Sequence, residues 1–246
     1  MPTAQRLRLI YRAWRYRFRK DPGEIALLRN LLASGDTALD IGAHKGAYTY
    51  WMQQAVGPAG RVFAFEPQPQ LAKELVEVFR HSAGVSVHPL GLSARPGRMT
   101  LHIPCGGPSP GASFEHGECV EGLERVEVAV ESLDHFFAAH SGRPVRFIKC
   151  DVEGHELEVF RGAKAILRDD RPTLLFECEQ RHHRADSFTA VFDHLASLGY
   201  SGSCFLRRKL IPLAEFRPEQ HQIPGRAPYV NNFVFQPLVR IARQAA

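Results

Sequence analysis

The chain lacks any run of eighteen apolar residues, and its first residues lack the continuous apolar core of a signal peptide. A helix that spans a bilayer needs about 20 predominantly apolar residues in a row. The sequence therefore predicts neither a spanning helix nor an export signal. We expect a cytoplasmic protein, with peripheral attachment to a membrane as the alternative.

Cysteine is scarce, with five in 246 residues, and no two of them form a Cys-x-x-Cys pair. An odd number without paired spacing argues against a disulfide framework and against a zinc site. It favours a reducing compartment, where cysteines serve as small buried apolar side chains. We assign no metal ligands to these residues, which are Cys105, Cys119, Cys150, Cys178 and Cys204.

Acidic residues are absent from residues 1–20, although the whole chain holds 26 acidic and 31 basic residues. Seven of the basic residues lie in this segment, so the remainder has 24 basic against 26 acidic residues and a net charge of −2. An enzyme that acts on nucleic acid usually carries positive charge around its cleft. We therefore expect no nucleic-acid partner. The seven residues are Arg6, Arg8, Arg12, Arg15, Arg17, Arg19 and Lys20.

The N-terminal segment has the pattern of an amphipathic helix with an aromatic stripe beside a basic one. One interpretation is a helix that packs on the body and leaves its arginines in solvent. Another is contact with a membrane surface or an anionic substrate, and a third is an arginine-rich transit segment. The two stripes are Leu7, Tyr11, Trp14 and Phe18, and Arg8, Arg12, Arg15 and Arg19.

Strand and helix patterns alternate along most of the remaining chain, which predicts an α/β fold with a mainly parallel sheet. The last strand follows another strand, so an antiparallel direction is open to it. The expected strands are 37–41, 61–65, 85–90, 147–152, 173–178, 203–206 and 232–235, and a single helix is expected over 154–168. Extended segments at 99–103 and 125–130 flank a loop at 104–122 that is rich in Gly, Pro and Ser, and we expect this loop to be an acceptor-site lid.

Residues 39–46 read LDIGAHKG and predict a nucleoside cradle between a strand and a helix. Glycines let the backbone approach a ligand, and a helix start offers free N–H groups. Glu66 follows Gly46 by twenty residues, at the end of the next strand, where a carboxylate accepts hydrogen bonds from ribose hydroxyls. The spacing Asp40-x-Gly42-x-x-x-Gly46 differs from the Gly-x-Gly-x-x-Gly of dinucleotide sites, and Asp40 would repel phosphate. S-adenosylmethionine, with a ribose, an amino acid head and no phosphate, fits better than NAD.

Acidic and imidazole side chains also follow the later strands of the predicted sheet. The run IKCDVEGHE carries Asp151, Glu153 and His155, and the next strand carries Glu177 and Glu179. Ligands of open α/β sheets bind beyond the carboxyl ends of the strands, so these side chains are expected at one edge. Clustered carboxylates repel unless a sulfonium, an ammonium or a metal ion neutralises them. A cluster that caps a helix N-terminus is the alternative.

Five blocks of the sequence together resemble FkbM-type S-adenosylmethionine-dependent methyltransferases: LDIGAHKGAYTY, RVFAFEPQP, FIKCDVEGHELEVFRGA, PTLLFECE and NNFVFQP. The resemblance runs from about Gly35 to Pro237. It implies a Rossmann-like class I methyltransferase fold with a mostly parallel seven-stranded sheet. It also implies cofactor binding by Asp40, Gly42 and Gly46, with Glu66 on the ribose. His44 is a further candidate for cofactor binding because it lies in the same run, although the family motif often has a small or amide residue there. The acceptor in this family is typically a hydroxyl of a sugar or a polyketide-like metabolite.

We divide the chain accordingly into N-terminal helices (1–33), a methyltransferase domain (34–238, with insertion loop 104–122) and a C-terminal tail (239–246). Asp151 or His155 is the expected general base, with Glu153 orienting the acceptor hydroxyl. The alternative is a divalent cation held by Asp151, Glu153 and Glu177. Two other functions remain open, which are an NAD-dependent sugar oxidoreductase or epimerase and a non-catalytic adapter that binds cofactor or glycolipid.

Overall fold

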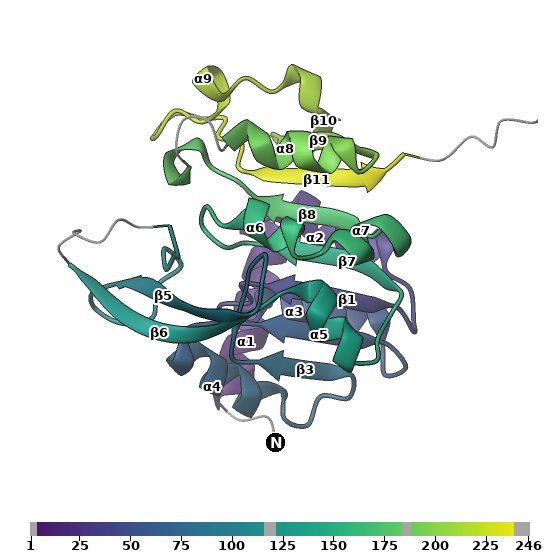
Figure 1. The fold of residues 1–246 in the computed structure, drawn as a ribbon, viewed down its shortest axis with the longest axis vertical. Helices are drawn as coiled ribbons and strands as arrows, with labels where there is room; N and C mark the ends of the chain where they lie inside the picture. The colour runs from purple at the N-terminus through teal and green to yellow at the C-terminus, as the bar shows by residue number, and fades with distance from the viewer. Residues whose placement is uncertain (1–3, 116–121, 184–187, 239–246) are drawn as a thin grey trace, which may run out of the picture.

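The computed structural model describes residues 4–115, 122–183 and 188–238, in which helices cover both faces of one large sheet (Figure 1). The predicted tail 239–246 lies outside the described residues, as does the tip of the predicted loop 104–122. In the described part of the chain, no helix is long and apolar enough to cross a membrane.

The sheet has eight strands in the order β10-β9-β11-β8-β7-β1-β2-β3. The five strands from β8 to β3 are parallel, and β11 is antiparallel to both β8 and β9. This confirms the mostly parallel sheet and its antiparallel last strand. The strands are β1 (Thr37–Ile41), β2 (Arg61–Phe65), β3 (Val85–His88), β7 (Val145–Cys150), β8 (Thr173–Glu177), β9 (Tyr200–Leu206), β10 (Lys209–Pro212) and β11 (Asn232–Pro237).

The eighth strand, β10, was not expected, and its turn explains why. Leu206 pairs with Lys209, so only Arg207 and Arg208 connect β9 to β10. Both arginines have positive φ, at 48° and 68°. A two-residue hairpin turn of this kind usually contains Asn-Gly or Asp-Gly, and two arginines give no such signal.

The expected helix over 154–168 is instead two short helices, α6 (Glu156–Arg161) and α7 (Lys164–Asp169). Gly162 lies at the break, where an added Cβ would lie 2.2 Å from the Ser93 carbonyl oxygen. The carboxylate of Asp134 then accepts hydrogen bonds from the Ala165 and Ile166 N–H groups at the start of α7. The other helices are α1 (Ala4–Arg15), α2 (Pro22–Leu31), α3 (Ala47–Val56), α4 (Pro69–Phe79), α5 (Leu133–Ala139), α8 (Phe188–Ser197) and α9 (Pro218–His221).

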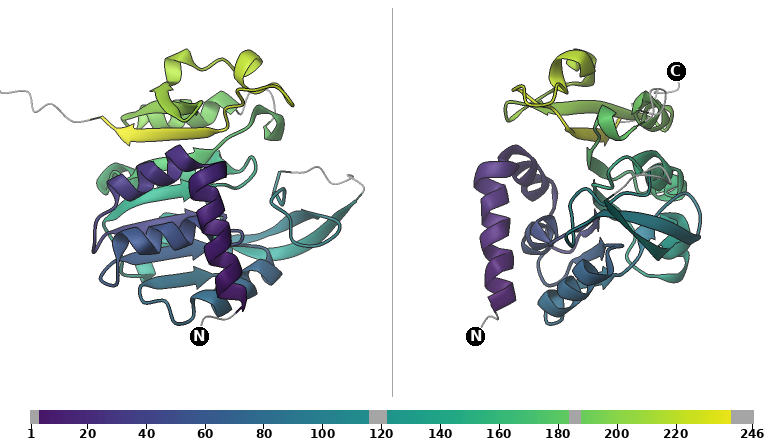
Figure 2. Two further views of the ribbon diagram at one scale, coloured as in Figure 1. Left: turned by 180° about the vertical axis from the view of Figure 1, so that it is seen from behind. Right: turned by 90° about the vertical axis from the view of Figure 1, so that its left-hand side faces the viewer.

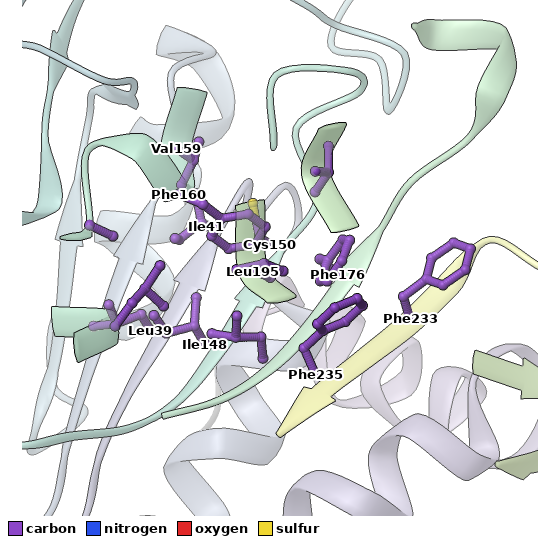
Figure 3. Packing of buried hydrophobic residues seen from close by; sticks show 14 of the residues in the cluster. Leu39, Ile41, Ile148, Cys150, Val159, Phe160, Phe176, Leu195, Phe233 and Phe235 are labelled. Carbon is purple, nitrogen blue, oxygen red and sulfur yellow. The ribbon is translucent and has the colours of Figure 1, made fainter. Parts of the chain in front are cut away.

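The core lies on both faces of the sheet, because alternate residues of each strand point to opposite sides. Leu39 and Ile41 of β1 join the larger cluster, which also takes in side chains of α5 to α8. Phe176, Phe233 and Phe235 pack together in this cluster beside α8 (Figure 3). The alternate residue Ala38 joins the cluster on the other face, with side chains of α2 and α3. Asp40 therefore points to the α3 side, where β1 ends beneath the cradle.

A second sheet of three strands, β4 (Gly91–Leu92), β5 (Gly97–Pro104) and β6 (Leu123–Glu131), replaces the irregular region between β3 and α5. The β5–β6 hairpin projects on the side where the parallel strands end (Figure 1). Its described turn residues fold back onto the hairpin, since Ser113 exchanges two backbone hydrogen bonds with His102. The segment predicted as an acceptor-site lid is therefore hydrogen-bonded, at Ser113, to strand β5.

The N-terminal helix α1 packs over α3 and α4 as an outer layer (Figure 2). A five-residue π-helical segment, η1 (Tyr16–Lys20), continues it. The buried residues of α1 are Leu9 and Ala13, and the indole N–H of Trp51 donates to the Ala13 carbonyl at 2.8 Å. The helix packs on the body, as one interpretation expected, but its aromatic stripe is not the packed face.

Candidate functional site

A cavity opens at the edge where the parallel strands end, with an empty volume of about 1140 Å³ that includes its mouth. Four strand ends, those of β1, β2, β7 and β8, contribute side chains to its lining. Of the predicted site residues, six line this cavity and two do not. The six are Asp40, Gly42, His44, Glu66, Asp151 and Glu153.

The cradle brings three backbone segments into close contact around Gly42. This glycine has a φ of 74°, and a Cβ built on it would lie 1.9 Å from the carbonyl oxygen of Asp151. Its N–H and that of Ala43 both donate to the Phe65 carbonyl at 3.0 Å. Because any side chain would collide with backbone, only glycine fits here.

The Glu66 carboxylate is held in place by the cradle. Its Oε2 accepts from the His44 N–H at 2.7 Å, and its Oε1 accepts from the Gln68 N–H at 2.9 Å. The residue is 2% exposed, and burial raises the pKa of Glu66 to about 7. Each oxygen keeps a second acceptor site, so the carboxylate can still accept hydrogen bonds from a bound molecule.

Asp40 lies beneath the cradle and is tied to the helix that follows it. The Thr49 hydroxyl donates to Asp40 Oδ2 at 2.5 Å. Burial raises the pKa of Asp40 to about 6. This hydrogen bond anchors the first turn of α3 to β1, so Asp40 has a structural contact besides its place in the cavity lining.

The side chain of His44 leaves one polar atom unsatisfied in the cavity wall. Its Nε2 is buried without a hydrogen-bond partner. Burial lowers the pKa of His44 to about 4, so the ring is neutral at neutral pH. A buried polar atom of this kind is rare, and a ligand in the cavity would satisfy it.

Gly46, predicted to contact the cofactor, lies outside the cavity lining. A Cβ at this position would lie 2.8 Å from Leu75 and 2.9 Å from Phe79, and its φ is 77°. The glycine is therefore required by the packing of α4 against the cradle rather than by the approach of a ligand.

Lys149 is a site residue that the sequence reasoning missed. The residue is 2% exposed, and its Nζ lies 3.4 Å from Asp151 Oδ2 and 5.2 Å from the ring centre of Tyr48. Burial by itself lowers the pKa of Lys149, but Asp151, Glu177 and Asp21 together raise it above its usual value. The site thus holds its own cation. The sequence did contain a signal for this contact. Residues two apart on an extended strand share a face, and Lys149 precedes Asp151 by two residues.

Glu153 and Glu177 extend the acidic wall of the cavity. Glu153 Oε2 lies 2.6 Å from His182 Nδ1, and burial raises the pKa of Glu153. The Glu177 carboxylate accepts from Asn231 Nδ2 at 2.8 Å, and burial together with the nearby Asp151 raises its pKa well above its usual value. His182 thereby fixes the orientation of a cavity carboxylate.

His155, one of the two expected bases, lies outside the lining of the main cavity. Its Nδ1 lies 2.6 Å from Glu115 Oε1, and its Nε2 lies 3.0 Å from the Ser93 hydroxyl. Both ring nitrogens are therefore engaged, and the residue is 3% exposed. This geometry does not favour proton transfer with a molecule in the cavity.

The alternative metal site was predicted at Asp151, Glu153 and Glu177. Among the residues that the structure describes, the group whose ligand atoms converge within 4.8 Å is a different one, Glu156, Cys178 and His183. Two of its contacts have hydrogen-bond length, with His183 Nε2 at 3.1 Å from Glu156 Oε2 and 3.2 Å from Cys178 Sγ. The predicted trio does not form such a group.

Segments far from the strand ends complete the cavity. Arg12, Tyr16 and Lys20 line it from α1 and η1, so the N-terminal helix belongs to the site. Hydrogen bonds of the loop between β5 and β6 also hold that hairpin against the cavity wall. Ser109 and Gln68 exchange hydrogen bonds at 3.0 Å, and the Ser113 hydroxyl donates to the Glu153 carbonyl at 2.6 Å.

Comparisons with known proteins identify the family of the chain. A family model described as the methyltransferase FkbM domain matches residues 40–201. The hexuronic acid methyltransferase AglP of Haloferax volcanii is 31% identical over 159 residues, which are 63% of this chain and 62% of that protein. The chain thus spans less than two thirds of the length of this relative.

Solved structures share the fold. Methyltransferase FkbM from Methylobacillus flagellatus KT superposes with a TM-score of 0.54 at 16% identity, covering 95% of this chain and 55% of that one. The O-methyltransferase from Bacillus cereus in complex with SAH has a TM-score of 0.51 at 11% identity, covering 95% and 90%. The class I methyltransferase fold expected from the sequence is confirmed.

Proposed function

Because the chain belongs to the methyltransferase FkbM family, we propose that it transfers a methyl group from S-adenosylmethionine to a hydroxyl of a sugar or glycan. The observation that carries the proposal is one cavity in which the cradle of Glu66 and His44 adjoins the acidic wall of Asp151 and Glu153. A nucleoside site and a proton-accepting wall in one cavity suit group transfer between two bound molecules.

The residues present fit S-adenosylmethionine. Glu66 is held with free acceptor sites for ribose hydroxyls, and the unsatisfied His44 Nε2 offers a further polar contact. Asp40 adds a carboxylate on the same side, which suits an ammonium group better than a phosphate. The bound cofactor would supply the methyl group and the leaving group for its transfer.

We assign the base role to Asp151. Its side chain is 35% exposed and lines the cavity, whereas both nitrogens of His155 are engaged elsewhere. Lys149 holds the Asp151 carboxylate from one side and leaves its other oxygen for an acceptor hydroxyl. Glu153, fixed by His182, orients the acceptor.

The acceptor class follows from the relative and from the charge of the site. The relative that is 31% identical is named a hexuronic acid methyltransferase, which supports a sugar acceptor. Arg181 and His182 line a second cavity that shares Glu153 with the first. Arg181 pairs with Glu179 at 2.7 Å, yet most of its side chain stays exposed, so we expect it to face an acidic sugar. We place the methyltransferase domain at residues 34–238, with residues 1–33 completing its site, and we propose a cytoplasmic location.

The proposal is tested by binding first and by transfer second. Calorimetry should show binding of S-adenosylhomocysteine and no binding of NAD. Labelled methyl from S-adenosylmethionine should then appear on oligosaccharides that contain hexuronic acid, and the label should survive mild alkali, which removes a methyl ester but leaves an ether. No binding of S-adenosylhomocysteine would contradict the proposal. Binding of S-adenosylhomocysteine without methyl transfer to any tested acceptor would favour the alternative function, a non-catalytic adapter.

Cofactor affinity is expected to depend on pH through Glu66. The pKa of Glu66 is about 7 because of burial, so this carboxylate is mostly neutral at pH 6 and mostly ionised at pH 8. The ionised form is the better acceptor for ribose hydroxyls. The dissociation constant of S-adenosylhomocysteine should therefore be about tenfold higher at pH 6 than at pH 8, and binding near pH 7 should release protons. Calorimetry in two buffers of different ionisation enthalpy measures both.

Glu66→Gln is the diagnostic variant for this prediction. It should weaken binding at pH 8 by about 10–100-fold, since a hydrogen bond to a charged group contributes about 1.5–3 kcal/mol. Its affinity should no longer vary between pH 6 and pH 8. Glu219→Gln, at an exposed position on α9, is the matched control and should keep the native profile. If the affinity of Glu66→Gln for S-adenosylhomocysteine still varied with pH, the titrating group would be another residue.

A further inference from the structure

The outward side of α1 and η1 carries large apolar side chains instead of polar ones. Leu7 is 55% exposed, Tyr11 71%, Trp14 43% and Phe18 57%. Among the described residues these are four of the seven exposed large apolar side chains. With the exposed arginines between them they form a surface that we call the outer face of α1, made of Leu7, Arg8, Tyr11, Trp14, Arg15, Phe18 and Arg19.

The arginines of the segment divide into two groups. Those on the inner side are used by the body. Arg12 donates to the Lys45 carbonyl at 2.9 Å, and Arg17 lies 4.9 Å from the ring centre of Trp51. The arginines of the outer face, Arg8, Arg15 and Arg19, are exposed. The cations of the outer face are therefore available to a partner, as are its apolar side chains.

The chemistry of the outer face matches an anionic lipid bilayer. Aromatic rings and leucine enter the boundary between headgroups and acyl chains, while arginines beside them pair with phosphates. Nucleic acid would also attract the arginines, but it gives leucine and aromatic side chains no apolar layer to enter, and the rest of the chain has a net charge of −2. Figure 2 shows that α1 is the outermost element on its side, so a flat surface can reach it.

We propose that the outer face of α1 docks the protein on an anionic membrane surface. The same helix offers Arg12, Tyr16 and Lys20 to the cavity from its inner side. Since an α-helix is about 10 Å across, a bilayer on the outer face lies within about that distance of the cavity wall. Docking thus places the site close to the membrane surface.

The test is co-sedimentation of the full chain with vesicles of phosphatidylcholine alone and of phosphatidylcholine with phosphatidylglycerol in equal amounts. Binding should be at least about tenfold stronger to the anionic vesicles. It should fall when salt is raised from about 0.1 M to about 1 M, which shortens the screening length from about 10 Å to about 3 Å. Equal binding to both vesicles, or none, would overturn the proposal.

Two sets of variants separate the apolar and the basic contributions. Leu7→Ser with Tyr11→Ser and Phe18→Ser should reduce binding to anionic vesicles by at least about tenfold. Val76→Ser with Leu210→Ser, at exposed apolar positions elsewhere, should leave binding unchanged. The basic set of Arg8→Gln, Arg15→Gln and Arg19→Gln should abolish the preference for anionic vesicles, whereas Arg95→Gln, Arg125→Gln and Arg146→Gln should retain it.

Trp14 provides a direct spectroscopic report, because the other tryptophan, Trp51, is buried at 4% exposure. Anionic vesicles should shift the fluorescence emission to shorter wavelength, and Trp14→Phe should remove that shift. The outer face of α1 could instead bind a second copy of this chain, and light scattering tests that alternative. A dimer in solution that the Leu7, Tyr11 and Phe18 substitutions dissociate, without vesicle binding, would overturn the proposal and assign the face to self-association.

Discussion

Asp151→Asn is expected to lower the turnover of methyl transfer by about 10²–10⁴-fold, the usual contribution of a general base. Asparagine keeps the size of the side chain but cannot take a proton from an acceptor hydroxyl. Cofactor affinity should change little, because the described contacts of the cradle run through Glu66, His44 and Gln68. The measurements are single-turnover rates at saturating cofactor and calorimetry with S-adenosylhomocysteine.

The control for Asp151→Asn is Asp193→Asn, at an exposed position on α8, which should keep native turnover and affinity. Loss of S-adenosylhomocysteine binding in Asp151→Asn would place this carboxylate with the cofactor rather than with the acceptor. Turnover within about a factor of three of the native rate would show that no proton passes through Asp151 and would direct attention to Glu153 and its partner His182.

Lys149→Met is expected to destabilise the protein by about 3–5 kcal/mol at pH 8. The substitution removes one partner of a buried ion pair and leaves carboxylates without a cation, which typically costs this much. Asp151, Glu177 and Asp21 are the acidic groups that act on the Lys149 ammonium. Urea unfolding measures the loss, and Lys164→Met, at an exposed position on α7, should stay within about 0.5 kcal/mol of the native protein.

The deficit of Lys149→Met should shrink as pH falls from 8 to 5. Burial already raises the pKa of Glu177 well above its usual value and that of Asp40 to about 6, and loss of the ammonium raises them further. A carboxyl whose folded pKa exceeds its unfolded pKa contributes stability below the unfolded pKa and loses it as pH rises through the folded pKa. The variant should therefore be closest to the native protein in acid. A deficit that is the same at both pH values would mean that packing, rather than charge, explains the loss.

Much of the geometry of the proposed cofactor cradle could be predicted because its determinants are local. Glycine spacing after a buried strand and a carboxylate at the end of the next strand follow directly from chain geometry, and Asp40, Gly42, His44 and Glu66 do line one cavity. Gly46 shows the limit of that reasoning. A glycine signals a close approach without saying to what, and here the neighbours are Leu75 and Phe79 of α4.

The catalytic side was harder to predict because it depends on contacts between distant segments. His155 follows Glu153 by two residues, yet Glu115 and Ser93, about 40 and 60 residues away in the chain, hold its ring outside the cavity. The eighth strand was missed for a local reason, since a hairpin turn made of Arg207 and Arg208 carries no turn signal.

By itself, the order of residues determined the alternation of strands and helices, the place of the nucleoside cradle and the basic character of the first twenty residues. These depend on periodicity and spacing within a few turns of chain. Only the tertiary structure decided that Lys149 neutralises an acidic wall, that η1 lines the cavity and that the aromatic side of α1 faces outward. Each of these depends on which distant segments pack together, and the burial that raises the pKa of Glu66 and Asp40 exists only after they have done so.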